Sequence, residues 1–237
     1  MRRTFAVDGS HARHHPGVIE VQELQVAVEA AFAQTTRRLA PWPDPHPDRS
    51  SVPDEAYSRL TNPAKWRILG ARTDAWLIAL VNAGLAIVEP DATVTWTIQR
   101  RPVISRAERA IPVAVGTLQL LVAHSQIGDV DDAGLVLGVG DPAVCVNWFP
   151  DCGCDACDSG SQNELDHLDA HMLSIVTGSF RRLSDGERVI TVIGDGGWSA
   201  SGFTPTGRRI GRQVEAVLAN PHGWDEMTGR SWLDTTA

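Results

Sequence analysis

Three cysteines lie close together in this 237-residue chain, at Cys152, Cys154 and Cys157. Thiolates spaced two and three residues apart on a tight turn can converge on one zinc ion, each at about 2.3 Å. The small residues between them, Gly153 and Ala156, leave the backbone room to wrap the ion. The spacing therefore predicts a zinc site in this loop, with the three sulfurs as ligands.

A closed structural zinc site takes four ligands, so the loop needs one more donor. The best candidate is His167, which falls near the start of a predicted helix just after the loop. Helical side chains lean toward the N-terminus of their helix, which aims His167 back at the cysteines. His171, one turn further along, and Cys145, on the preceding predicted strand, are the competing candidates.

Two other chemistries compete for the same cysteines. Zinc with three protein ligands and an open position could activate water in a hydrolase-like enzyme, but three thiolates offset the Lewis acidity of the cation. A thiol redox role is disfavoured by Asp151, Asp155 and Asp158, because nearby negative charge raises the pKa of a thiol. Unligated thiols in a loop whose aspartates form turns are the simplest alternative. The pattern favours a non-enzymatic protein whose cysteine loop either binds a structural zinc ion or serves as an ordered recognition surface, and it identifies no catalytic residue.

Three further motifs fail on their context. Gly138-Val139-Gly140-Asp141-Pro142-Ala143 matches a loose dinucleotide fingerprint, but a predicted strand follows where the pyrophosphate needs a helix N-terminus. The segment from Gly197 to Gly202 misses the nucleophile-elbow spacing by one residue. The carboxylates of Asp129, Asp131 and Asp132 lack the later glutamate of a calcium loop. We interpret these motifs as a hairpin turn, a hairpin strand and a solvated connection.

The composition is that of a soluble globular protein, with 43% apolar and 21% charged residues. Asn82 and Gln119 interrupt the longest apolar segments before they reach the roughly 18 to 20 residues of a membrane helix. The chain start lacks the apolar stretch of a signal peptide. A net charge of −8 repels phosphate backbones. We expect a cytoplasmic protein that binds neither nucleic acid nor membrane, which leaves a protein as the macromolecular partner that the sequence allows.

Hydrophobic periodicity predicts helices that are not regularly interleaved with strands. The expected helices run over 21–39, from Asn62-Pro63 to a cap at Gly84, over 165–176, and from Thr204-Pro205 to Asn220-Pro221. The expected strands run over 93–98, 113–123 with a bulge near Gly116, 135–139, 144–149, 188–193 and 198–203. This order favours an α+β fold, a mainly antiparallel sheet with helices packed on one side, in a single domain.

The chain outside these elements falls into two segments. Residues 1–17 lack periodicity, which predicts a mobile N-terminal lead before a domain that spans 18–237. Residues 40–53 hold five prolines and cannot continue a helix. They form a linker or an extended surface strap that Trp42 could pin. We expect proteases to cut both segments first, because neither carries a periodic apolar face.

Two blocks of sequence resemble an actinobacterial family of unknown function, the DUF6226-type proteins. One is Ser58-Arg59-Leu60-Thr61-Asn62-Pro63, leading into an amphipathic helix, and the other is Phe149-Pro150-Asp151-Cys152-Gly153-Cys154-Asp155-Ala156-Cys157-Asp158. The resemblance covers residues from about 55 to 220. It implies that the thiol block and the Asn-Pro helix start are features of the family type and that the source is a streptomycete-like bacterium. It implies no activity.

Overall fold

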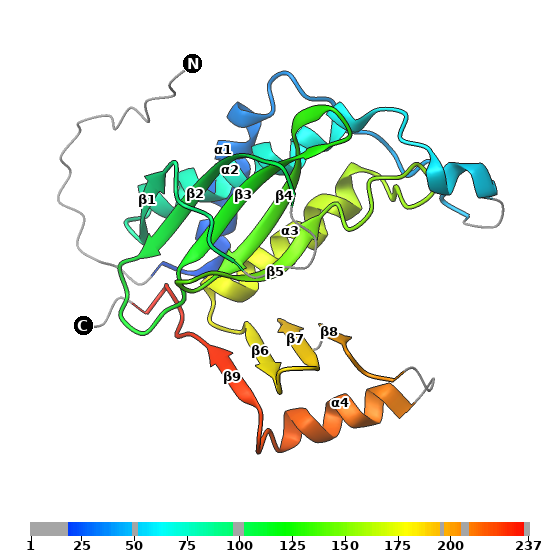
Figure 1. Ribbon diagram of the computed structural model, residues 1–237. Helices are drawn as coiled ribbons and strands as arrows, with labels where there is room; N and C mark the ends of the chain where they lie inside the picture. The colour runs from blue at the N-terminus through cyan, green and yellow to red at the C-terminus, as the bar shows by residue number, and fades with distance from the viewer. Residues whose placement is uncertain (1–18, 49–51, 97–101, 195–196, 205–208, 235–237) are drawn as a thin grey trace.

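The computed structural model describes residues 19–48, 52–96, 102–194, 197–204 and 209–234, in which helices and two antiparallel sheets combine (Figure 1). The helices are α1 (Val21–Thr35), α2 (Arg67–Asn82), α3 (Ser161–Val176) and α4 (Arg209–Ala219), with short 3₁₀ helices at Asp54–Ser58 and Pro63–Trp66. The α+β class predicted from the sequence is confirmed. The lead predicted at residues 1–17 lies outside the described residues.

The larger sheet is a meander in which each strand pairs with the next one along the chain. Its strands are β1 (Ala86–Pro90), β2 (Ile104–Pro112), β3 (Leu120–Ile127), β4 (Val130–Val139) and β5 (Val144–Phe149). The register places Arg106 opposite His124, and His124 opposite Leu135. Strands β3 and β4 are buried along most of their length, since they lie in the middle of a sheet that is covered on both faces.

Helices α1, α2 and α3 lie together on one face of the larger sheet (Figure 1). Arg72 of α2 ties them together, because its guanidinium binds Glu29 of α1 and Asp169 of α3. The Trp76 indole donates a second hydrogen bond to Asp169, with a nitrogen–oxygen distance of 2.7 Å. A buried, hydrogen-bonded arginine of this kind fixes how three amphipathic helices pack on the sheet.

The opposite face of the larger sheet carries a smaller apolar cluster, which the segment after β1 covers. Val94 and Trp96 pack into this cluster, and the Trp96 ring lies against Gly138 of β4. The strand predicted at 93–98 is therefore wrong over 93–96, where no strand forms, and 97–98 lie outside the described residues. The alternating pattern is real, but it arises because the segment buries every second side chain without joining the ladder.

A second strand prediction is also wrong in detail, and two strands of the larger sheet lie where none was expected. The strand predicted from Val113 begins only at Leu120, and Gly116 lies in the β2–β3 connection with φ +80°, so no bulge forms there. Strands β1 and β2 were not predicted, because their charged and apolar residues do not alternate simply. The helix cap at Gly84 is confirmed by its φ of +70° and by its N–H bond to Val81 O.

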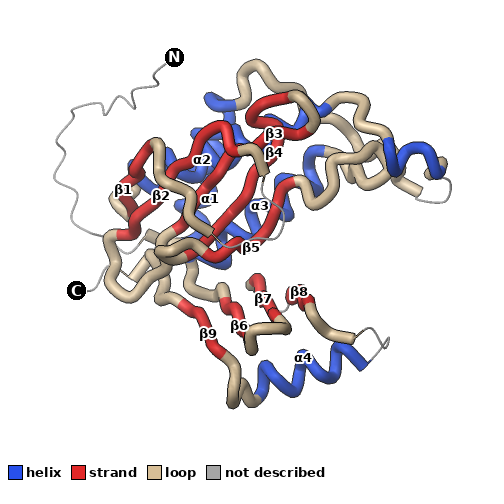
Figure 2. The backbone as a smooth tube through the Cα atoms, in the orientation of Figure 1, coloured by secondary structure: helices blue, strands red, loops and turns tan. Residues whose placement is uncertain are grey.

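The second sheet has the order β8-β7-β6-β9 and lies beside the larger one (Figure 2). Its strands are β6 (Arg181–Ser184), β7 (Val189–Ile193), β8 (Gly197–Ser201) and β9 (Asp225–Thr228). The predicted β7–β8 hairpin is confirmed. Leu183, Ile190 and Val214 form a small core between this sheet and α4. Among the described helices none is long and apolar enough to cross a membrane.

Candidate metal-binding site

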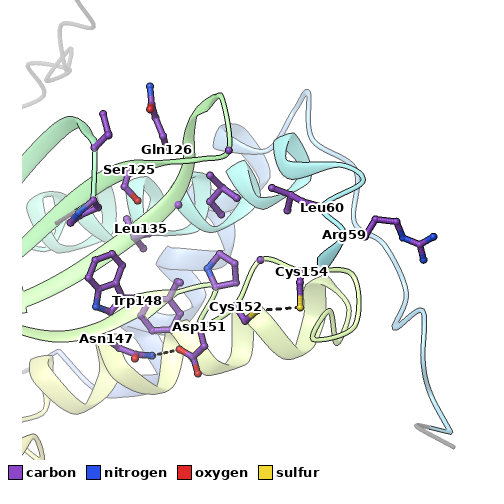
Figure 3. Close-up of a pocket in the computed structure, with 18 of the residues that line it drawn as sticks. Arg59, Leu60, Ser125, Gln126, Leu135, Asn147, Trp148, Asp151, Cys152 and Cys154 are labelled. Carbon is purple, nitrogen blue, oxygen red and sulfur yellow. Dashed lines mark hydrogen bonds between the residues drawn. The ribbon is translucent and has the colours of Figure 1, made fainter. Parts of the chain in front are cut away.

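The loop between β5 and α3 brings the three predicted sulfur ligands together. The Sγ atoms of Cys152, Cys154 and Cys157 all lie within 4.8 Å of one another. Those of Cys152 and Cys154 point toward each other at 3.2 Å (Figure 3). Two sulfurs on one tetrahedral zinc ion lie about 3.8 Å apart, as follows from zinc–sulfur bonds of about 2.3 Å. Small rotations of these side chains would therefore convert the cluster into three of the four corners of a zinc site.

Asp155 anchors the loop to the segment that leads into α2. Its carboxylate accepts hydrogen bonds from the Thr61 N–H at 2.9 Å, from the Thr61 hydroxyl and from the Arg59 Nε at 3.2 Å. Its own N–H donates to the Arg59 carbonyl at 2.9 Å. The hydrogen bonds from Thr61, with the charge of Arg59, hold the pKa of Asp155 below its usual range. The two sequence blocks that carry the family resemblance are thus in direct contact.

Asp158 fixes the other end of the loop. Its carboxylate is 3% exposed and forms an ion pair with Lys65. It also accepts hydrogen bonds from the Trp42 indole at 2.8 Å and from the Gly160 N–H at 3.0 Å. The Lys65 ammonium lies 5.2 Å from the Trp42 ring centroid and 5.0 Å from that of Trp66. These contacts join the loop, the strap and the start of α2 into one polar and aromatic layer.

The proline-rich strap is docked on the protein through Trp42, as the surface strap that the sequence allowed, and early cleavage by proteases stays a prediction. Trp42 donates its N–H to the Ser161 hydroxyl and accepts the Ser161 N–H, both at 3.0 Å. Gly160 lies so close to the strap that an added Cβ would come 2.5 Å from Asp44 N. The strap needs no periodic apolar face for this attachment, because backbone hydrogen bonds and the Trp42 indole hold it in place. Residues 49–51 of the strap lie outside the described residues.

The three aspartates of the loop all have hydrogen-bond or ion-pair partners, and the thiols interact chiefly with one another. Asp155 and Asp158 are engaged as described, and Asp151 accepts a hydrogen bond from Asn147 at 3.0 Å. Burial opposes ionisation of Cys154, yet hydrogen bonds from Cys152 and Cys157 and from the loop backbone lower its pKa. The hydrogen bond to Cys154 and burial raise the pKa of Cys157 to about 12. Among the three thiols, Cys154 is therefore the one whose ionisation the neighbouring hydrogen bonds favour.

The candidate fourth ligands lie outside the group of three sulfurs. His167 and His171 stack edge-on, with ring centroids 4.7 Å apart, and both contact the Phe149 ring. Burial lowers the pKa of His171 below its usual range. Cys145 packs in the cluster on the opposite face of the sheet, where burial raises its pKa to about 11. His167 as the fourth ligand stays a prediction.

A pocket of about 950 Å³ opens beside the cysteine loop (Figure 3). Leu60 and Ile127 form part of its wall, together with Phe149 at the end of β5. Cys152 and Cys154 line it as well, whereas Cys157 does not. Two of the three clustered sulfurs are therefore placed at the edge of a cavity of ligand-binding size.

The chain matches a family described as "Family of unknown function (DUF6226)" over residues 28–236. It belongs to this family. The match includes the strap and the second half of α1, so the DUF6226 sequence extends further toward the N-terminus than the resemblance read from the two blocks. No curated protein and no solved structure matches the chain.

This DUF6226 chain also brings together a second group of residues of the kinds that can bind a metal, which the sequence did not indicate. Asp74 of α2, Glu108 of β2 and His124 of β3 place one donor atom each within 4.8 Å of the others. Arg106 occupies the same space, with its Nη2 3.1 Å from Asp74 Oδ1 and 3.2 Å from His124 Nδ1. A metal-bound histidine donates the N–H of its other ring nitrogen to a hydrogen-bond acceptor. The Arg106 guanidinium beside His124 has only donors and cannot accept that bond. We therefore interpret the group as a charge network that joins α2 to the sheet.

Proposed function

We propose that Cys152, Cys154 and Cys157 together bind one zinc ion and that this DUF6226 protein is a non-enzymatic zinc-binding protein. The observation that supports it is the convergence of three sulfurs within 4.8 Å on one loop. Thiolates are the ligands that zinc takes in structural sites. The ion would cross-link a loop that Asp155 and Asp158 already hold in place.

The third thiol favours zinc over a redox role. A dithiol–disulfide couple needs two cysteines, and the remaining sulfur in this cluster would have no part in it. Three thiolates also supply enough negative charge to make the ion a poor activator of water, which argues against a hydrolase. Thiolate ligands must stay reduced, so the proposal places the protein in a reducing compartment such as the cytoplasm.

The test is the metal content of the full chain, purified without a chelator or a metal-affinity column. Native mass spectrometry should find one zinc ion per chain, and Cys154→Ser should remove it. Cys145→Ser is the matched control, because Cys145 is a free thiol outside the cluster, and it should retain the metal. A folded chain without metal, whose clustered thiols all react with an alkylating reagent, would contradict the proposal.

Metal removal should also lower stability. Zinc at a free concentration 100 times its Kd stabilises the folded state by about 2.7 kcal/mol. A loss of that size lowers the Tm of a chain of this length by about 5 to 10 °C. A chelator should produce this shift in the natural protein and in Cys145→Ser, and none in Cys154→Ser, because that variant has no metal to lose.

A further inference from the structure

We propose that the pocket beside the cysteine loop binds a small-molecule thiol whose sulfur becomes the fourth ligand of the zinc ion; this inference rests on the zinc site proposed above. The position of the sulfurs is the first argument. Cys152 and Cys154 line the pocket, while Cys157 is not part of its lining. An ion held by all three sulfurs is therefore at the edge of the pocket. Within the described chain no other cysteine, histidine or carboxylate belongs to the sulfur group.

The ligand set is the second argument. Three thiolates make a soft, electron-rich set that reduces the affinity of zinc for water and other hard oxygen donors. A fourth sulfur completes the tetrahedral set of thiolates that zinc accepts in structural sites. In the binding step the thiol loses its proton to solvent, its sulfur forms a bond to zinc, and a solvent ligand leaves. No oxidant or reductant takes part in this exchange.

The walls of the pocket define the rest of the ligand. A volume of about 950 Å³ falls in the range of small-molecule sites, which run from roughly 300 to 1,000 Å³. Leu60, Ile127 and Phe149 provide apolar contact, and Gln126 provides an amide. Only two charged residues occur among the described residues of the lining. They are Arg59, which is paired with Asp155, and Asp151, which is bonded to Asn147. The pocket suits a thiol with an apolar or amide-bearing body and little net charge.

The test uses the full chain loaded with Co²⁺, whose visible absorption reports its ligands. Benzyl mercaptan should change this absorption and saturate at one thiol per cobalt ion. Benzyl alcohol has the same shape with a hydroxyl in place of the thiol, and it should leave the spectrum unchanged at the same concentration. A chain that takes up no cobalt overturns the metal site and this inference together. If the protein binds cobalt but its absorption does not change when the thiol is added, this inference alone is overturned and the proposed metal site is not.

Two variants locate the thiol. Val103 and Val113 are both 62% exposed, but only Val103 lines the pocket. Val103→Trp should therefore weaken benzyl mercaptan binding by about tenfold with the cobalt content unchanged, whereas Val113→Trp should bind as the natural protein does. Equal thiol binding by the two variants would place the thiol outside the pocket and overturn the inference.

His167→Ala decides whether a protein side chain already fills the fourth position. With an open position, the thiol-free cobalt spectrum and the thiol affinity of this variant match those of the natural protein. A changed thiol-free spectrum, together with thiol binding that appears only after the imidazole is removed, would make His167 the fourth ligand and overturn the inference.

Discussion

Glu108 of β2 faces α2, with its carboxylate next to the Arg106 guanidinium and the His124 imidazole. Its Oε2 is 3.4 Å from His124 Nε2, and Arg106 forms an ion pair with the other oxygen. Burial on its own would raise the pKa of this carboxyl, but His124 and Arg106 lower it below its usual range. His124 itself is fully buried, with Gly70 of α2 packed against its ring. The network therefore keeps an ionised glutamate inside the protein.

This ionisation predicts an acid-dependent loss of stability. A carboxyl whose pKa is lower in the folded state stabilises the fold above its unfolded pKa of about 4.3, and the contribution is lost as the pH falls through the folded pKa. Glu108→Gln should therefore lower the free energy of unfolding by about 2 kcal/mol at pH 7, and the gap should narrow as the pH falls below about 4. Urea unfolding across this pH range measures the effect. Glu89→Gln, at an exposed position of β1, is the control. A gap that stays constant in acid would contradict the role given to Glu108.

The two groups of potential ligands differ in how far sequence reveals them. The cysteines could be predicted because they come from one loop, where spacing alone determines proximity. Asp74, Glu108 and His124 come from three elements and meet only through the register of β2 with β3 and the packing of α2. No local sequence pattern predicts that residues from three separate elements lie close together. The anchoring of the loop by Thr61 and Lys65 was hidden for the same reason.

At the scale of elements, the helices could be predicted more fully than the strands. Helix α3 and strand β5 lie close to where periodicity placed them. Strand β2 was missed because its core-facing residues include Arg106 and Glu108, which read as solvent-exposed in the sequence. Conversely, Trp96 and Val94 read as a strand although they cover a sheet without pairing. Alternating burial is enough to produce the alternating sequence pattern, whereas a strand also requires backbone pairing with a neighbouring strand.

The strap is an element without regular structure, and its attachment can be tested at Trp42. Trp42→Phe retains an aromatic ring but removes the indole N–H that Asp158 accepts. The loss of a hydrogen bond to a charged group should lower the free energy of unfolding by about 1.5 kcal/mol, and proteolysis within 40–48 should become faster. Trp198→Phe, at a half-exposed site on β8, should change neither measurement. Equal cleavage rates in the strap of the natural protein and Trp42→Phe would show that the indole does not hold it.

Gly160 provides a second test of strap docking. The residue has φ +84°, and a Cβ there would come 2.5 Å from Asp44 N and 2.9 Å from Pro43 C. Gly223 has nearly the same φ, +83°, with nothing within 4 Å of an added Cβ. Gly223→Ala should therefore cost about 1 kcal/mol for the backbone conformation alone, and Gly160→Ala about 2 kcal/mol more for the overlap with the strap. Chemical denaturation compares the two. Equal losses would mean that the strap can move away freely.

At the scale of the whole molecule, the last described residues return from the small sheet to the larger body. The Arg230 N–H donates to Gly116 O at 2.9 Å, and the Trp232 N–H donates to Val176 O at 2.8 Å. Gly178 faces this segment so closely that a Cβ would come 2.7 Å from Ser231 N. The second sheet is therefore joined to the larger body both where the chain enters it after α3 and where the chain leaves it after β9 (Figure 1).

Trp232 makes this closure part of the main core, which leads to a prediction about cooperativity. Its side chain is fully buried among residues of the larger body, whereas Trp198 on β8 is 40% exposed. Trp232→Ala should lower the free energy of unfolding by about 3 to 5 kcal/mol, and Trp198→Ala by no more than about 0.5 kcal/mol. Because the backbone hydrogen bonds of Arg230 and Trp232 to the larger body remain in Trp232→Ala, far-ultraviolet dichroism and tryptophan fluorescence should still report one coincident transition, at a lower temperature. Two separated transitions, with the small sheet melting first, would show instead that the two sheets fold as independent units and that the single domain predicted from the sequence is wrong.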